Sequence, residues 1–260
     1  MSVRVWSPAM QVAIVIPARD EQRSVGDVVA SARHAVPGAR VIVVDDASSD
    51  ATAHVARCAG AHVLSLGRHA GYAGALLAGY REAMAGRPGA VVQMDADGQH
   101  RADDLPDLLG SLGPADVVLG SRFLGPDPGY RIPRLRRAGM TACRWMASGV
   151  GGVGLTDPTS GLRAMTPAAA GHIADRGFPS GLTESSLLIH LHRQGFRIRE
   201  VPVRMNASRS GSMHAGLAGG AHMLRISWAV LGLASRPAPR AQPAMPSPAP
   251  VHAGHPEPPL

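Results

Sequence analysis

Short apolar runs alternate with longer helical patterns between Val12 and about Gly120. This alternation is typical of a parallel sheet whose strands are joined by crossover helices. The runs are mostly apolar throughout, as expected for strands that are covered on both faces. They predict strands at Val12–Ile16, Val41–Val44, His62–Leu66, Ala90–Met94 and Val117–Gly120.

Helical patterns lie between these strands, near Ser24–His34, Asp50–Ala59, Gly71–Ala85 and Asp103–Leu112. Ser49 and Asp50 are candidate N-caps for the second helix, because their side chains can accept hydrogen bonds from the first turn. Asp103 and Asp104 are interpreted in the same way before the fourth helix. The first half of the chain therefore predicts an α/β fold with flanking helices.

The second half is less regular. It predicts a turn at Asp157–Gly161, a helix near Thr183–Gln194 and a strand at Arg197–Val203. Residues 217–234 are apolar but contain His222 and Arg225, which favours a helix on a membrane surface over a full span. We therefore expect an N-terminal extension at 1–11, a folded domain at 12–213, an amphipathic helix at 214–235 and a disordered Pro- and Ala-rich tail at 236–260.

Polar residues follow three of the predicted strands, at Pro17–Glu21, Asp45–Asp50 and Asp95–Gln99. In open α/β sheets, ligands bind beyond the carboxyl ends of the strands. The three segments are therefore expected to converge on one site.

The segment MDADGQH carries the strongest chemical signal, because Asp95 and Asp97 directly follow an apolar strand and alternate residues point the same way. Mg²⁺ or Mn²⁺ takes oxygen ligands and is completed by substrate phosphates, so two carboxylates suffice. We predict a cation site at Asp95, Asp97 and Gln99, with Asp97 as the first choice. Asp95 can instead bind the nucleotide ribose, and a solvated acidic turn is the structural alternative.

Two further motifs add nucleotide-binding candidates. In VIVVDDASSDAT, Asp46 can accept hydrogen bonds from a base or a ribose, whereas Asp50 is interpreted as mainly structural. In VIPARDEQ, Glu21 either contacts the nucleotide or is a first-turn helix residue that the helix dipole favours.

Together IPARDE, VDDASSDAT and DADGQH resemble the family 2 glycosyltransferases, in particular the dolichyl- and polyprenyl-phosphate sugar synthases. The resemblance extends from Val12 to Met213. It implies a GT-A fold with a Rossmann-like, mostly parallel sheet, a nucleotide-diphosphate sugar donor of the GDP-mannose or UDP-glucose class, and Mg²⁺ or Mn²⁺.

Carried over by position, the resemblance implies functional side chains in several groups. Nucleotide-sugar contacts are expected from Pro17, Arg19, Glu21, Val44, Asp46, Asp95, Ala96, Gln99 and Arg122. Arg122 in GSRF and Arg163 in TSGLRAM match family arginines, and Arg209 and Ser212 lie in RSGSM, which resembles an acceptor loop. Contacts to the acceptor phosphate are expected from Arg163, Arg209 and Ser212. The chain departs from the family pattern in two loops. It has Arg19 and Asp20 where the family often has an aromatic residue and asparagine, and His69 where the family commonly has Asn. These positions bear on base and sugar specificity.

The implied reaction is an inverting displacement at the anomeric carbon. A polyprenyl phosphate acceptor is already anionic near neutral pH, so arginines that bind phosphate bidentately suffice to position it. A hydroxyl acceptor requires a carboxylate to take its proton, and Glu184 is then the candidate base. The catalytic candidates are therefore Asp97, Arg122, Arg163, Glu184 and Arg209.

Composition changes this interpretation little. The formal charge is +7, but the sequence has no Lys and its arginines are dispersed among few aromatic residues, so we expect no nucleic-acid partner. Cys58 and Cys143 lack metal-ligand spacing and are expected to be reduced thiols. With no signal-peptide pattern, a cytoplasmic protein is expected, peripheral on the inner membrane face if residues 214–235 bind lipid.

Other enzyme classes fit less well. A sugar nucleotidyltransferase would have a glycine-rich basic loop after the first strand, where this chain has PARDEQ. A dinucleotide-dependent dehydrogenase would have G-x-G-x-x-G at that place. A basic binding module without enzymatic activity is the remaining, more distant alternative.

Overall fold

The computed structural model describes residues 10–125, 154–177 and 184–206. Within them a seven-stranded sheet has the order β3-β2-β1-β4-β6-β5-β7. All neighbouring strands are parallel except β6, which is antiparallel to both β4 and β5. The strands are β1 Val12–Ala18, β2 Arg40–Asp45, β3 His62–Ser65, β4 Ala90–Gln93, β5 Val117–Ser121, β6 Arg163–Met165 and β7 Ile198–Pro202.

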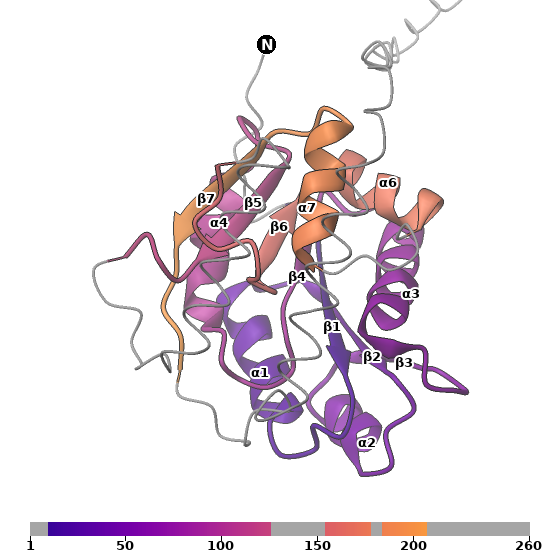
Figure 1. Ribbon diagram of the computed structural model, residues 1–260. Helices are drawn as coiled ribbons and strands as arrows, with labels where there is room; N and C mark the ends of the chain where they lie inside the picture. Colours follow the sequence, from indigo (N-terminus) through magenta and orange to yellow (C-terminus); the bar gives the residue numbers. More distant parts are fainter. Residues whose placement is uncertain (1–9, 126–153, 178–183, 207–260) are drawn as a thin grey trace, which may run out of the picture.

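Helices cover both faces of the sheet (Figure 1). One face packs against α1 Val25–Ala35, α2 Thr52–Cys58 and α4 Leu105–Gly110, and the other against α3 Gly71–Ala85, α6 Pro167–Arg176 and α7 Glu184–Arg193. Alternate residues of β1 enter the two cores, since Ile14 and Ile16 lie in the first and Ala13 and Val15 in the second. A short 3₁₀ helix at Ala102–Asp104 precedes α4.

The predicted strands and helices are present, with ends that move by a few residues, and the bounds of α3 are as predicted. The sequence analysis missed β6 and α6. Strand β6 has three residues and is too short to show a period. Helix α6 did carry a signal, because Thr166 caps it by accepting from the N–H of Ala169 and Pro167 occupies its first position.

The N-cap residue of α2 is Ala51 rather than Ser49 or Asp50, whereas Asp104 is the N-cap residue of α4 as predicted, although its side chain makes no capping hydrogen bond. Helix α2 starts at Thr52, and Asp50 accepts hydrogen bonds from the N–H groups of Thr52 and Gln22. Before α4, Asp103 pairs with Arg101 and Asp104 accepts from the N–H of Arg204, so neither carboxylate caps the helix. Asp50 therefore binds the first residue of α2 as well as the loop after β1, and Asp104 binds the chain after β7.

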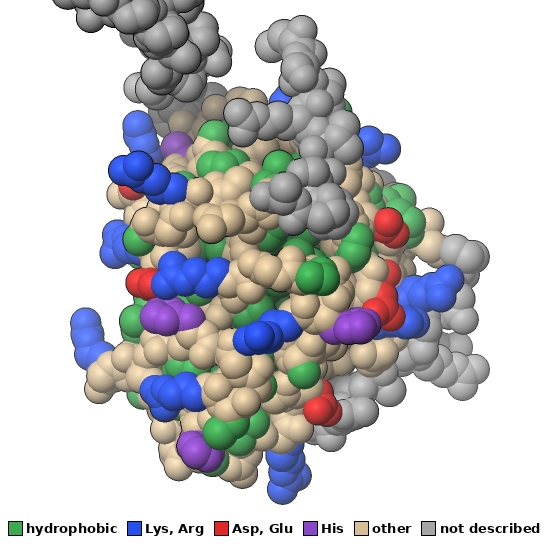
Figure 2. All heavy atoms as spheres, turned by 180° about the vertical axis from the view of Figure 1, so that it is seen from behind, with side chains coloured by type: hydrophobic (Ala, Val, Ile, Leu, Met, Phe, Trp, Pro, Cys, Tyr) green, Lys and Arg blue, Asp and Glu red, His purple; other side chains and the backbone are tan. Residues whose placement is uncertain are grey.

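In the described ranges, no helix is both long enough and apolar enough to cross a bilayer. On the face shown in Figure 2, arginine side chains are scattered and mixed with acidic and histidine side chains. Residues 214–235 and 236–260 lie outside the described residues, so the membrane-surface helix and the tail stay predictions.

Candidate active site

The loops that follow β1 and β2 are joined by hydrogen bonds. The N–H of Asp20 donates to Ser48 Oγ at 3.0 Å, and the N–H of Ser49 donates to Asp20 Oδ1 at 2.7 Å. The N–H of Glu21 donates to Thr52 Oγ1 at 2.8 Å. Two of the three predicted segments thus form one unit, in which Asp20 and Ser49 hold the loops together.

Asp46 lies beneath the loop that starts α3. Its carboxylate accepts hydrogen bonds from the N–H groups of Ala70 at 2.6 Å and Gly71 at 3.0 Å, and lies 2.7 Å from Nδ1 of His69. The carboxylate is buried, whereas the imidazole of His69 is half exposed. The structure therefore gives Asp46 a role in holding this loop, and its contact with a nucleotide stays a prediction.

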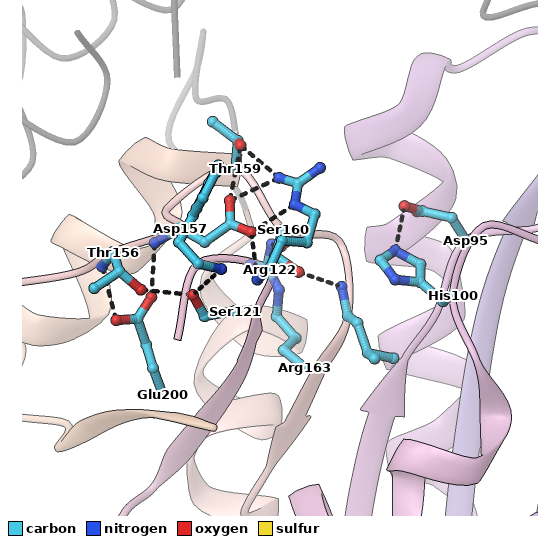
Figure 3. A network of polar contacts seen from close by, with 12 residues as sticks. Asp95, His100, Ser121, Arg122, Thr156, Asp157, Thr159, Ser160, Arg163 and Glu200 are labelled. Carbon is cyan, nitrogen blue, oxygen red and sulfur yellow. Dashed lines mark hydrogen bonds and ion pairs between the residues drawn. The ribbon is translucent and has the colours of Figure 1, made fainter. Parts of the chain in front are cut away.

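Asp95 is held from two sides at the carboxyl end of β4. The hydroxyl of Tyr72 donates to Oδ1 at 2.8 Å. On the other side, Nε2 of His100 lies 3.1 Å from Oδ2, as Figure 3 shows. Burial raises the pKa of Asp95, but the hydrogen bonds of His100 and Tyr72 and the charge of Arg163 outweigh it, so the net pKa is lowered. Asp95 is therefore an oriented carboxylate.

Asp97 and Gln99 continue the segment through a turn at Gly98, whose φ is +74°. Asp97 Oδ1 accepts from the N–H of Gln99 at 2.9 Å, and the carbonyl of Gln99 accepts from the N–H of Asn206. Ala96 between the two aspartates packs into the core, as does Val44. Both can contact a nucleotide only through their backbone.

Glu21 faces the acidic groups of the other two segments. Its Oε2 accepts from Ser24 Oγ at 2.6 Å. Burial raises the pKa of Glu21, and the negative charges of Asp97, Asp50 and Asp95 raise it further. The predicted convergence of the three segments is therefore confirmed. Pro17, the last but one residue of β1, is buried, and Arg19 is partly exposed beside Asp20.

The two arginines that match the family lie below the surface (Figure 3). Arg122 pairs with Asp157 through Nε and Nη2, both at 2.6 Å, and Nη2 also donates to Thr159 Oγ1 at 2.9 Å. Arg163 donates from Nη2 to the carbonyl of Ser160 at 2.9 Å. Both side chains are buried, so their contact with a phosphate stays a prediction.

Two carboxylates in this network were missed by the sequence analysis. Asp157, which was seen only as part of a turn, is fully buried against Arg122. Glu200, on β7, accepts from the N–H groups of Thr156 at 2.7 Å and Asp157 at 2.8 Å. The D-P-T turn downstream of the GSRF arginine was the available signal for Asp157, whereas nothing in the local pattern marked Glu200.

The remaining predicted residues are only partly located. Glu184 is the first residue of α7. Arg209 and Ser212 lie outside the described residues.

The chemistry of this site fits a hard divalent cation. Asp95 and Asp97 both follow β4, and the negative charge of each raises the pKa of Glu21, so both carboxylates lie near that side chain. Among the residues that the structure describes, no group of three or more His, Cys, Asp or Glu side chains is placed to hold a metal ion. Two carboxylates with positions left for substrate oxygens are the arrangement expected for Mg²⁺ or Mn²⁺ that binds together with a diphosphate.

The chain matches the family model for glycosyl transferase family 2 over residues 13–165. It is 32% identical over 247 residues to the undecaprenyl-phosphate mannosyltransferase of Micrococcus luteus, which covers 87% of this chain and 96% of that protein. It is 30% identical over 210 residues to the dolichyl-phosphate hexose transferase of Haloferax volcanii, covering 80% of this chain and 89% of that protein.

Among solved structures, the fold is similar to glucosyl-3-phosphoglycerate synthase from Mycobacterium tuberculosis in complex with Mn²⁺, uridine diphosphate and glucosyl-3-phosphoglycerate. The TM-score is 0.69, the sequence identity is 21%, and the match covers 89% of this chain and 85% of that one. At this identity the likeness establishes the fold alone.

Proposed function

We propose that this chain, which belongs to glycosyl transferase family 2, moves a hexose from a nucleotide-diphosphate sugar to a polyprenyl phosphate. The observation that carries the proposal is the pair Asp95 and Asp97 after β4, with Glu21 beside them. The relatives from Micrococcus luteus and Haloferax volcanii, which are named for transfer to lipid phosphates, support this acceptor class.

In this proposal Asp97 and Asp95 hold Mg²⁺ or Mn²⁺, and Gln99 lies beside a phosphate or a ligand water. When bound, such a cation stabilises the negative charge that develops on the departing diphosphate. The solved relative that contains Mn²⁺ and uridine diphosphate supports a cation of this kind. Glu21, Asp46 and the backbone at Pro17, Val44 and Ala96 would line the nucleotide.

The acceptor reacts from the opposite face of the sugar. A phosphate oxygen attacks the anomeric carbon, the bond to the diphosphate oxygen breaks, and the configuration inverts. The oxygen is already ionised near neutral pH, so no general base is required. Arg163 supplies positive charge next to Asp95, which offsets the crowding of anions, and we propose that Arg122, Arg209 and Ser212 help to bind phosphate.

A transfer assay tests the proposal. The full chain is incubated with Mg²⁺ or Mn²⁺, polyprenyl phosphate and, in turn, GDP-mannose, UDP-glucose and related donors, and glycolipid is measured. We expect product with one donor class and loss of product with EDTA. Asp97→Ala should abolish transfer, whereas Asp103→Ala, which removes an exposed carboxylate paired with Arg101, should keep it. Full activity of Asp97→Ala would overturn the cation assignment.

The same assay separates the two acceptor classes. A phosphate acceptor needs no proton acceptor, so Glu184→Gln should retain most of its activity. A saccharide or other hydroxyl acceptor would instead give product without polyprenyl phosphate, and Glu184→Gln would then lose activity by a factor of about 10² or more. This second result would show that the acceptor is a hydroxyl and would overturn the proposed lipid phosphate acceptor.

We also propose that the chain works at a membrane surface, where a polyprenyl phosphate is located. Residues 214–235 are the predicted contact, because this stretch is rather apolar but contains His222 and Arg225. A chain that ends at residue 213 should float less with anionic vesicles than the full chain does. Equal flotation of the two would count against this contact.

A further inference from the structure

A row of hydrogen bonds leads from the core to Asp95. The hydroxyl of Tyr80 donates to Gln93 Oε1 at 2.5 Å, and Gln93 Nε2 donates to the hydroxyl oxygen of Tyr72 at 3.0 Å. The hydroxyl of Tyr72 then donates to Asp95 Oδ1 at 2.8 Å. Tyr80 and Gln93 are fully buried, whereas Tyr72 is 43% exposed. The row of hydrogen bonds therefore connects the buried side chains of Tyr80 and Gln93 to Tyr72 and, through it, to Asp95.

Helix α3 and strand β4 build this row together. Tyr72 and Tyr80 both belong to α3, and Gly79 lets this helix approach the sheet, because a Cβ there would lie 2.3 Å from Val15 Cγ1. Gln93 is the last residue of β4. Its side chain lies on the same face as the side chain of Asp95 two residues later, since alternate residues of a strand share a face.

The direction of donation in the row is set by its two ends. Gln93 accepts only at Oε1 and donates only at Nε2, so a donor at Oε1 turns its amide hydrogens toward Tyr72. Tyr72 has one hydroxyl hydrogen, and an ionised carboxylate can only accept. Since the Tyr72 oxygen accepts from Gln93, its hydroxyl hydrogen is donated to Asp95.

The loop that leads into α3 also contacts Asp46, another residue predicted to bind the nucleotide. The N–H groups of Ala70 and Gly71, directly before Tyr72, donate to Asp46. Asp46 follows β2 and Asp95 follows β4, so the start of α3 binds one carboxylate through its backbone and the other through the Tyr72 side chain. A shift of this loop would move both partners together.

We propose that Tyr72 is a positioning residue that sets the orientation of the Asp95 carboxylate for the donor diphosphate and its cation, with Gln93 holding Tyr72 in place. This inference rests on the proposed function. The competing explanation is that the hydroxyl of Tyr72 only satisfies the buried amide of Gln93. The two explanations differ in what they predict for ligand binding, because only the first acts through Asp95.

The test compares Tyr72→Phe with Tyr80→Phe, each of which removes one hydroxyl from the same row. The readouts are thermal unfolding and the affinity of the protein for Mn²⁺ in the presence of UDP or GDP. The electron paramagnetic resonance signal of free Mn²⁺ measures this affinity. Tyr80→Phe, at the fully buried end, should lose at least as much thermal stability as Tyr72→Phe. Tyr72→Phe should weaken Mn²⁺ binding about tenfold or more, since hydrogen bonds to charged groups are the stronger ones, whereas Tyr80→Phe should weaken it less than about threefold.

A double variant identifies the route. If Tyr72 acts through Asp95, then adding Tyr72→Phe to Asp95→Asn should weaken Mn²⁺ binding no further than Asp95→Asn alone. Independent, multiplying losses would overturn the inference, as would equal losses in Tyr72→Phe and Tyr80→Phe or wild-type affinity in Tyr72→Phe. A wild-type chain that binds no Mn²⁺ with either nucleotide would instead contradict the proposed function.

Discussion

The backbone of Gly161 lies against the carboxylate of Asp95, and a Cβ on Gly161 would be only 2.2 Å from Asp95 Oδ2. The second half of the chain therefore closes directly onto the end of β4. Asp157, Thr159 and Ser160 belong to the segment that brings Gly161 to this place, and Arg122 binds that segment from β5. The position of Asp95 is thus set by contacts from both halves of the chain.

Gly161→Ala should displace Asp95 and reduce transfer by a factor of about 10 to 10², because small misplacements of reacting groups carry costs of this size. The loss should appear in sugar transfer and in Mn²⁺ affinity. Gly110→Ala in α4 is the matched control, because a Cβ there meets no atom within 4 Å. Wild-type transfer by Gly161→Ala would show that the carboxylate tolerates the shift.

The buried pair of Arg122 and Asp157 should matter for stability. Asp157→Ala leaves the guanidinium of Arg122 buried without its carboxylate, which is expected to cost about 3 kcal/mol in the free energy of unfolding. Chemical denaturation measures this loss. The double variant Arg122→Met with Asp157→Leu should recover most of the stability, since no lone charge remains, but not the transfer activity. An active double variant would remove Arg122 from the catalytic candidates.

Glu21→Gln should stabilise the protein while it weakens nucleotide-sugar binding. Burial and neighbouring carboxylates raise the pKa of Glu21 above its ordinary value of 4.5, so the folded state disfavours the charged form and loses stability as pH rises above that value. The neutral amide avoids this cost, and the thermal midpoint should rise at pH 7 but not below pH 4.5. The KM for the donor should rise. A lower midpoint at pH 7 would contradict the electrostatic explanation.

The pair His172 and His190 should make stability depend on pH. Their Nε2 atoms are 3.4 Å apart between α6 and α7, next to Phe196. Burial lowers the pKa of both rings, and the charge of Arg176 lowers it further, so the unfolded chain binds more protons near pH 6.5 and below. The thermal midpoint should therefore fall as the pH decreases from 6.5.

His190→Gln should make this pH dependence shallower because one titrating ring is lost. His192→Gln, at an exposed position on the same helix, is the control and should keep the wild-type slope. Thermal unfolding at several pH values between 5 and 8 measures the difference. Identical slopes in all three proteins would exclude the pair as the origin.

Local patterns in the sequence were sufficient for most of the fold. The apolar runs predicted the strands that became β1 to β5, and the resemblance of DADGQH to its family pointed to Asp95 and Asp97. Antiparallel β6 was missed because three residues carry no measurable period. Asp50 stands one residue before the N-cap of α2, and the side chain of Asp104 does not cap α4 because it accepts from the N–H of Arg204, a distant partner that has no local signature.

The sequence by itself determined that the carboxylates follow β1, β2 and β4, because side-chain polarity and strand periodicity are properties of neighbouring residues. Only the tertiary structure decided which groups hold them. Tyr72 lies 23 residues from Asp95, and Arg122 lies 35 residues from Asp157. Pairs at such separations meet only after the sheet has assembled and its helices have packed, so the support of Asp95 could be found only in the folded chain.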